Sequence, residues 1–139
     1  MQYPVRVYYE DTDASGVAYH ANYLRWFERA RTEWLRGLGF GQERLLREAG
    51  IGFTVASLSV RYLRPARLDD ELIVRTQVLA VGKASIRFEQ HIHYAGAEPG
   101  AALAMASVRV GCVGVGDFRP RRMPDAIEQA LMKELGHVG

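Results

Sequence analysis

The part of the chain that most suggests chemistry is residues 9–23, which read YEDTDASGVAYHANY. Glu10, Asp11 and Asp13 place three carboxylates within four residues, and Gly16 then permits a sharp turn. A carboxylate near the free N–H groups of a helix start can attack a carbonyl or activate a water, while those N–H groups stabilise the developing oxyanion. The segment therefore predicts acyl-transfer chemistry. The alternative is that these carboxylates only bind backbone N–H groups of their own loop.

The elements on either side of this segment position it. Alternating residue types predict a short strand over Val5–Glu10, followed by a loop over Asp11–Ala21. Asn22 is the expected N-cap of a long helix that ends near Gly37. The inner side of this helix is unusually apolar and aromatic, so we expect deep packing; its residues at helical spacing are Tyr23, Phe27, Ala30 and Trp34.

The remainder of the chain is mostly strand. Four strands joined by hairpin-like turns are expected over Ala56–Tyr62, Leu72–Val81, Ala84–Tyr94 and Ala102–Val113. Short helices are expected over Gln42–Ala49 and about Asp125–Leu135. Hairpins make an antiparallel sheet, and one long apolar helix can cover one of its faces, which predicts an α+β domain spanning residues 1–139. The strand order does not follow from the pattern.

Composition narrows the class of protein. The chain has 139 residues, 48% apolar and 24% charged, which is typical of one soluble globular domain. A net charge of +2, and an Arg119–Arg122 run without interleaved aromatic residues, argue against a nucleic-acid partner. No apolar run approaches the roughly 20 residues of a membrane span, and the N-terminus does not resemble a secretory signal. Cys112 is the only cysteine, so we expect a cytoplasmic protein without an internal disulfide.

Several ordered blocks carry a resemblance over nearly the whole chain. They are Asp11-Thr12-Asp13, Gly16-Val17, Tyr19-His20-Ala21-Asn22-Tyr23, Glu28-Arg29-Ala30-Arg31, Glu33-Trp34-Leu35 and, more weakly, Gly82-Lys83-Ala84-Ser85. Together they resemble the 4-hydroxybenzoyl-CoA thioesterase family, most closely its branch of bacterial acyl-CoA thioesterases associated with the Tol–Pal cluster. The resemblance implies a hotdog fold, in which a curved five-stranded antiparallel sheet wraps one long central helix. It also implies homodimers whose sheets join, often paired into homotetramers, with active sites at the dimer interface.

The same resemblance assigns roles to residues. Asp13 is the implied nucleophile or general base, the backbone N–H of His20 is the oxyanion donor, and Gly16 shapes the loop between them. The side chains of His20 and Tyr9 are also implied to line the site. The implied reaction is hydrolysis of an acyl-CoA thioester, with no cofactor beyond the CoA of the substrate.

Substrate-binding candidates are less specific. Val17 and Tyr19 are candidates for the acyl pocket, and the phosphates of CoA call for cations such as Lys83 and Arg61, with Ser85 beside the former. Arg64 and the Arg119–Arg122 run are further cationic candidates, although a solvated surface charge is the favoured interpretation of each.

Other interpretations remain open from the residues alone. A non-catalytic acyl-CoA or acyl-carrier-protein binder on the same fold is the main alternative, although a binder has little use for Asp13 beside a thioester. A dehydratase would need a separate His-bearing motif, which the sequence lacks.

Asp11 and Glu10 either tune the pKa of Asp13 or act as caps and solvated charges. His91 and His93 share a strand face without a third metal ligand, so we expect surface histidines, whereas Cys112 should be buried.

Overall fold

The computed structural model describes residues 2–96 and 101–135. The predicted turn at 96–100 therefore lies mostly outside the described residues. In chain order the elements are β1 (Gln2–Arg6), η1, a 3-10 turn (Tyr9–Asp11), α1 (His20–Gly37), α2 (Gln42–Ala49), β2 (Ile51–Tyr62), β3 (Glu71–Val81), β4 (Ser85–Tyr94), β5 (Ala104–Gly114) and α3 (Asp125–Lys133).

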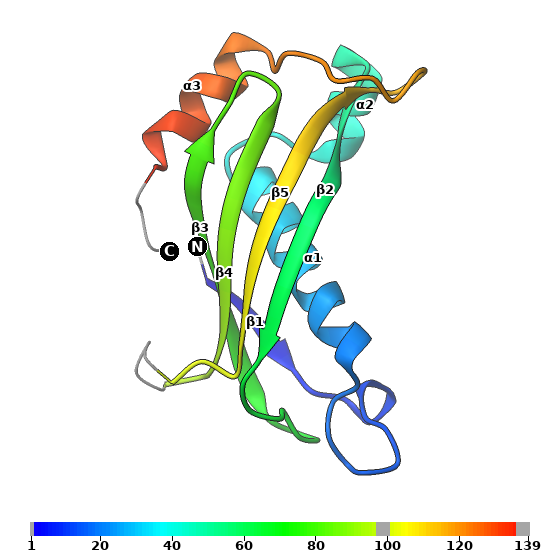
Figure 1. The fold of residues 1–139 in the computed structure, drawn as a ribbon, viewed down its shortest axis with the longest axis vertical. Coiled ribbons are helices and arrows are strands. Elements are labelled where there is room, and N and C mark those ends of the chain that lie inside the picture. The colour runs from blue at the N-terminus through cyan, green and yellow to red at the C-terminus, as the bar shows by residue number, and fades with distance from the viewer. Residues whose placement is uncertain (1, 97–100, 136–139) are drawn as a thin grey trace.

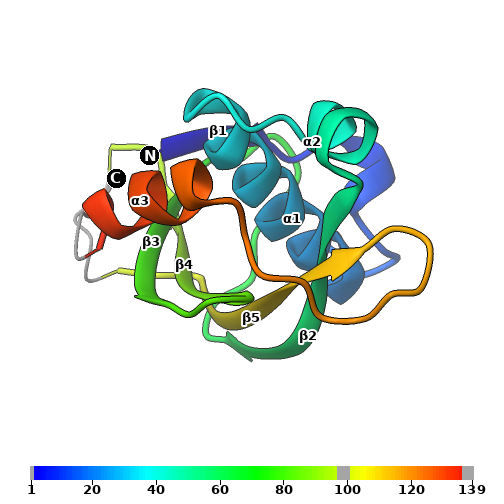
Figure 2. The ribbon, with the colours of Figure 1, turned by 90° about the horizontal axis from the view of Figure 1, so that it is seen from above.

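The strands form one five-stranded antiparallel sheet in the order β1-β3-β4-β5-β2, and α1 lies within its curve (Figures 1 and 2). Strands β3, β4 and β5 follow one another as hairpins, as predicted. The prediction of a hairpin between β2 and β3 is wrong, because in the described part of the chain β2 pairs with β5 alone and forms an edge of the sheet. Segment 63–70 crosses to the other edge of the sheet. At its start the N–H groups of Leu63 and Arg64 donate to the Leu103 carbonyl. At its end the Asp69 N–H donates to the Val7 carbonyl, and the Asp70 carbonyl accepts the Val7 N–H.

Helix α1 packs its apolar side against the sheet, as its spacing predicts. Trp34 meets Phe88 of β4 edge-on with ring centroids 5.4 Å apart, and the β5 residues Ala104 and Ala106 leave room for the helix. The buried side chains of α1 are Asn22, Tyr23, Trp26, Phe27, Ala30, Arg31, Trp34 and Leu35.

One polar network lies inside this contact. Arg31 Nη1 donates to Gln90 Oε1 at 2.9 Å, and Gln90 Nε2 donates to the Phe27 carbonyl and to Thr76 Oγ1, both at 3.0 Å. The network links the middle of α1 to β3 and β4 through buried hydrogen bonds. Burial still disfavours the charged form of Arg31 and lowers its pKa.

The two predicted boundaries on either side of the loop are wrong. Strand β1 ends at Arg6 rather than Glu10, because the Asp11 carboxylate accepts the Tyr8 N–H at 2.9 Å and caps the turn at Tyr9–Asp11. Tyr9 consequently points into solvent with 82% of its surface exposed. Helix α1 begins at His20, so Asn22 is already inside the helix and does not cap it.

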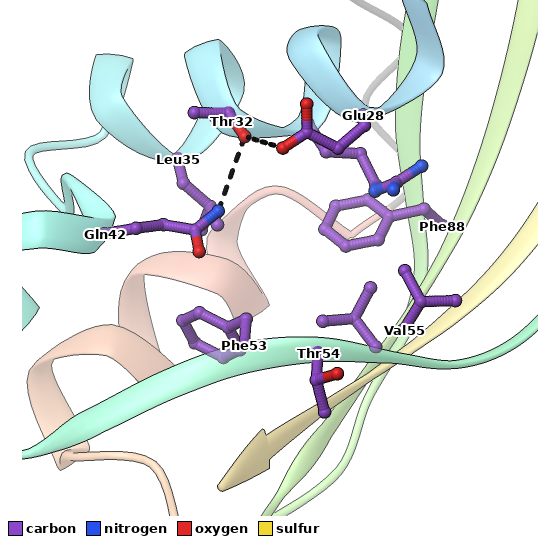
Figure 3. A pocket seen from close by; sticks show the side chains of 10 residues that line it. Glu28, Thr32, Leu35, Gln42, Phe53, Thr54, Val55 and Phe88 are labelled. Atoms are coloured by element: carbon purple, nitrogen blue, oxygen red, sulfur yellow. Dashed lines mark hydrogen bonds between the residues drawn. The ribbon is translucent and has the colours of Figure 1, made fainter. Parts of the chain in front are cut away.

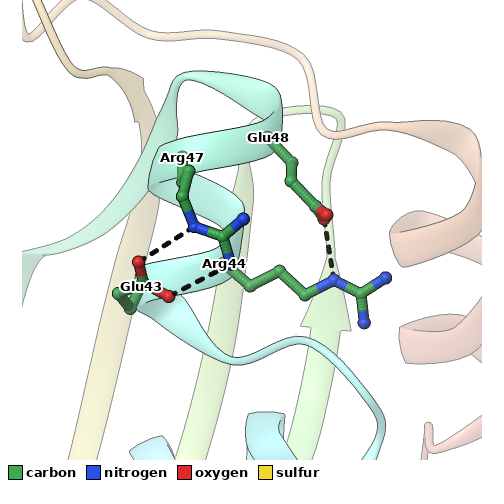
Figure 4. Close-up of polar contacts among 4 residues, drawn as sticks. All are labelled: Glu43, Arg44, Arg47 and Glu48. Carbon is green, nitrogen blue, oxygen red and sulfur yellow. Dashed lines mark hydrogen bonds and ion pairs between the residues drawn. The ribbon is translucent and has the colours of Figure 1, made fainter.

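Helix α2 spans Gln42–Ala49 as predicted and ends at Gly50, whose φ of 64° is left-handed. Its outer side carries two ion pairs, Arg44 with Glu48 at 2.7 Å and Arg47 with Glu43 at 3.1 Å (Figure 4). All four side chains are exposed, so each pair stabilises the helix only slightly.

His93 is not at the surface, contrary to the sequence expectation. Only 2% of it is exposed, and within residues 2–96 and 101–135 neither ring nitrogen has a hydrogen-bond partner. Burial lowers the pKa of His93 below its usual value, and the neighbouring His91 and Arg75 lower it further. Cys112, in contrast, is fully buried as predicted.

This burial predicts a pH-dependent stability. Well above the ordinary histidine pKa of about 6.5, His93 is neutral in both the folded and the unfolded state. As the pH falls below that value, the unfolded chain binds a proton that the folded chain resists, so the free energy of unfolding should fall by at most about 1.4 kcal/mol per pH unit. Urea unfolding at pH 7.5 and 5.5 should show a smaller decrease for His93→Phe than for wild type. An equal decrease in both proteins would contradict the assignment.

Candidate active site

The loop before α1 holds Asp13 in a tight turn. The Asp13 N–H donates to the Val17 carbonyl and the Gly16 N–H donates to the Asp13 carbonyl, both at 3.0 Å. Gly16 has a φ of 82°, a left-handed conformation that favours glycine, which accounts for its place in this turn. The Asp13 carboxylate accepts the Ser15 N–H at 2.8 Å and also the Ser15 hydroxyl.

The loop is tied to the start of α1. The Tyr19 N–H donates to the Asp11 carbonyl at 2.8 Å, and the Ala18 N–H donates to the Ala66 carbonyl at 2.7 Å. Because α1 begins at His20, the His20 amide lies in the first turn, where an N–H has no acceptor within the helix. The Asp13 turn and this amide are therefore two ends of one short, hydrogen-bonded loop.

Tyr62 is a site residue that sequence reasoning missed. Its ring meets that of His20 edge-on with centroids 4.9 Å apart, and its hydroxyl donates to the His20 carbonyl at 3.4 Å. Tyr62 ends β2 on the apolar face of the strand, so its pattern resembled that of a core residue. Only the tertiary structure, which lays the end of β2 beside the start of α1, reveals this contact.

A cleft of about 220 Å³ opens beside the start of α1. Its wall is mostly apolar with one cation, and the lining residues are Val17, Ala18, His20, Tyr23, Tyr62, Leu63, Arg64 and Pro65. Val17 and His20 thus line the same cleft, and the ring of Tyr19, which is 54% exposed, meets the His20 ring edge-on with centroids 6.0 Å apart. Arg64 is the cation at this cleft. Arg61 pairs with Met105 in the sheet register and points to the face opposite Tyr62.

Two predicted substrate-binding residues lie far from this cleft in the same chain. Lys83 lies in the β3–β4 turn and Ser85 is the first residue of β4, at the end of the sheet opposite the Asp13 loop (Figure 1). There Lys83 forms an ion pair with Glu128 of α3 at 3.1 Å. Tyr9 also points away into solvent. One chain therefore brings together Asp13, Gly16, Val17, Tyr19 and His20, but not Lys83, Ser85 or Arg61.

The electrostatics of the loop favour an ionised Asp13. The Ser15 hydroxyl, then the Ser15 N–H and more weakly His20, lower the pKa of the Asp13 carboxyl below its usual value. The Asp11 carboxylate accepts the Tyr8 N–H and caps the turn before the loop. Of the two interpretations of Asp11 from sequence, the structure supports the cap.

Removing the Ser15 hydroxyl should raise the pKa of Asp13 toward the ordinary aspartate value of about 3.9. We expect a carboxyl-carbon NMR titration of Ser15→Ala to give a higher Asp13 midpoint than wild type. Ser107→Ala, which alters an exposed serine on the outer face of β5, is the matched control and should leave the midpoint unchanged. An unchanged midpoint in Ser15→Ala would show that the hydroxyl does not stabilise the carboxylate.

A second, smaller cavity of about 90 Å³ lies between α1, α2 and β2. Figure 3 shows Phe53 and Phe88 on its apolar side, with Thr32 accepting from Gln42 at 3.4 Å and donating to Glu28 at 3.1 Å on the other. The buried Arg31 and the β2 residues Thr54 and Val55 also line it. The cavity therefore borders the edge strand of the sheet.

Two further features concern metals and membranes. Among the residues that the structure describes, no group of three or more His, Cys, Asp or Glu side chains is arranged to hold a metal ion. Within the same residues, none of the helices is both long and apolar enough to span a membrane.

Comparison with known proteins gives the family. The model of the thioesterase-like superfamily matches residues 7–131. The acyl-CoA thioesterase YbgC of Haemophilus influenzae is 48% identical over 129 residues, 93% of this chain and 92% of that protein. The acyl-CoA thioester hydrolase YbgC of Escherichia coli O6:H1 is 45% identical over 126 residues, 91% of each chain. A probable thioesterase from Bartonella henselae superimposes with a TM-score of 0.80 at 34% identity, covering 89% of this chain and 98% of its own.

The chain belongs to the thioesterase-like superfamily. Its fold is the predicted α+β hotdog fold, with a five-stranded antiparallel sheet around a long helix.

Proposed function

We propose that the protein hydrolyses acyl-CoA thioesters to a free acid and CoA. The observation that carries this proposal is the loop that joins an ionised, exposed Asp13 to the first amide of α1 at the edge of an apolar cleft. The thioesterase names of the YbgC relatives, at 48% and 45% identity, support it. Within the superfamily we also propose membership of the 4-hydroxybenzoyl-CoA thioesterase family and of its Tol–Pal-associated branch, which the blocks 11–13 and 19–23 support. The buried, unpaired Cys112 suits a reducing cytoplasm.

The proposed mechanism uses two groups of the loop. The thioester carbonyl binds at the His20 N–H, where the positive end of α1 stabilises the oxyanion. In one route Asp13 attacks the carbonyl carbon, the C–S bond breaks, and water then hydrolyses the mixed anhydride. In the other, Asp13 takes a proton from water as that water attacks, and the C–S bond breaks when the tetrahedral oxyanion collapses. In both routes the CoA thiolate accepts a proton from the His20 ring or from solvent. Neither route calls for a metal or a redox cofactor.

We also propose that two copies join through β2. This strand is a sheet edge of 12 residues whose outer backbone groups are available for pairing. Three apolar side chains along it are substantially exposed, Val55 at 46%, Leu58 at 40% and Tyr62 at 42%. Antiparallel pairing with β2 of a second copy about a two-fold axis would continue the sheet and cover these side chains. Two such dimers would form the homotetramer that the sequence resemblance implies.

This pairing would complete the site from two chains. Antiparallel pairing would place the end of β2, where Tyr62 contacts His20, beside the start of β2 in the second copy. The start of β2 borders the cavity of Figure 3. The acyl group would then enter that cavity from the cleft. The same two-fold axis carries the second copy's β3–β4 turn toward the Asp13 end of the sheet. Lys83 and Ser85 would reach the CoA phosphates there, with Arg64 lining the cleft and Arg61 on the outer face.

The direct test is release of CoA thiol from short-chain, long-chain and aryl acyl-CoA thioesters. Turnover of any of them supports hydrolysis, and the preferred chain length reports the size of the acyl cavity. If no thiol is released but acyl-CoA binds in calorimetry, the protein is instead the non-catalytic binder considered from sequence. Acyl thioesters of an acyl-carrier protein belong in the same panel.

A further inference from the structure

Asn22 is a buried polar residue whose orientation the structure determines. It is the third residue of α1 and only 5% exposed. Arg25 Nη1 donates to Asn22 Oδ1 at 3.2 Å, and Asn22 Nδ2 donates to the Asp11 carbonyl at 2.7 Å. Because a guanidinium can only donate, Arg25 holds the oxygen of the amide on its own side and leaves the NH₂ group facing Asp11.

The Asp11 carbonyl is the junction between the helix and the loop. It accepts both the Asn22 side chain and the Tyr19 N–H, at 2.7 and 2.8 Å. Asp11 lies two residues before Asp13, and Tyr19 lies one residue before His20. The Asn22 side chain therefore joins the strand side of the loop to the helix side between the two groups that the reaction uses.

A second connection holds the other side of the same helix turn. The Tyr23 hydroxyl accepts the Ala66 N–H at 2.9 Å, and the Ala66 carbonyl accepts the Ala18 N–H at 2.7 Å. Tyr23 thus anchors segment 63–66 and the last residues of the loop. Within residues 2–96 and 101–135, the hydrogen bond of the Tyr23 hydroxyl goes to Ala66, whereas the Asn22 amide donates to the Asp11 carbonyl on the strand side of the loop.

We propose that Asn22 is a positioning residue, which sets the separation between the Asp13 carboxylate and the His20 N–H through the Asp11 carbonyl. The inference rests on the proposed hydrolysis at Asp13. Reactions between positioned groups are sensitive to displacement, and a misplacement of about 1 Å can cost roughly a hundredfold in rate. Losing the Asn22 donor should therefore lower kcat about 10- to 100-fold. KM should stay within about twofold, because Asn22 does not line the cleft.

Asn22→Asp tests this role while keeping an oxygen that accepts from Arg25. The favourable interaction of a carboxylate with the helix dipole and with the Arg25 guanidinium offsets part of the cost of burying it, and the urea midpoint reports the remainder. The new side chain keeps the oxygen that faces Arg25 but cannot donate to the Asp11 carbonyl when ionised. The quantities to measure are kcat, KM and the urea midpoint of wild type, Asn22→Asp and Asn22→Ser. Asn22→Ser, which keeps a polar group without a charge, serves as the test if Asn22→Asp does not fold.

Gln90→Ala is the matched control. Gln90 is also a buried amide whose Nε2 donates to a backbone carbonyl, that of Phe27 at 3.0 Å, but it lies between the middle of α1 and the sheet. Its loss should lower the urea midpoint and leave kcat close to wild type.

The outcomes separate the inference from the proposed function. A lower kcat with an unchanged KM in the Asn22 variants, but not in Gln90→Ala, supports positioning. Wild-type kcat in a folded Asn22→Asp protein overturns the inference alone, as does an equal loss of kcat in Gln90→Ala. A wild type that releases thiol from no acyl-CoA overturns the proposed function and the inference together.

Discussion

Replacing Asp13 with Asn should lower kcat for acyl-CoA hydrolysis by about a thousandfold while the chain stays folded. An amide is neither a nucleophile nor a general base at this position, and such groups contribute roughly 10²- to 10⁴-fold in rate. The fold should persist, because the Asn oxygen can still accept the Ser15 N–H and hydroxyl that now bind the Asp13 carboxylate. Thiol release and urea unfolding on the same preparation check both parts.

Glu10→Gln is the control for this experiment. Glu10 is an exposed carboxylate three residues earlier, so the substitution makes the same change of charge close to the loop. It should leave kcat near that of wild type. A folded Asp13→Asn protein with near-native turnover would remove Asp13 from the mechanism, whereas equal losses in both variants would indicate a general effect of loop charge.

Replacing Leu58 with Lys should break the proposed dimer and the activity together. Leu58 lies near the middle of β2, so the two-fold axis of an antiparallel pair would bring both copies of the new charge close together in an apolar interface. Burying like charges without partners costs several kcal/mol, so we expect the dimer Kd to rise at least about a hundredfold. Sedimentation equilibrium measures the mass in solution, and thiol release measures the activity of the same samples.

Leu79→Lys is the matched control for the edge. Leu79 lies on β3 and is exposed to a similar degree, 44% against 40% for Leu58, but β4 and β5 separate β3 from β2 in the sheet. It should leave both the mass and the rate unchanged. A Leu58→Lys protein that remains dimeric and active would show that the copies do not join through β2. A monomer with full activity would show that one chain suffices for the reaction.

Local sequence signals predicted the elements with a strong period or a clear end. Helix α2 has its predicted bounds, because Gly50 takes the left-handed conformation that ends it. The buried side of α1 was predicted because apolar residues three and four positions apart share one helix face. The N-cap of α1 was predicted three residues too late, at Asn22 instead of Tyr19. Asn22 is a good capping residue by type, but here its amide binds the Asp11 carbonyl.

The sequence by itself determined the candidate chemistry, the helices and the hairpins β3–β4–β5, because each depends on residues close together along the chain. Only the tertiary structure decided that β2 lies at the sheet edge, that Tyr62 contacts His20, and that His93 is buried. These features depend on which strand pairs with which, and strand pairing joins residues that are distant in sequence. The alternation of a strand indicates two faces but does not name its neighbours, and so the pattern left the order of the sheet open.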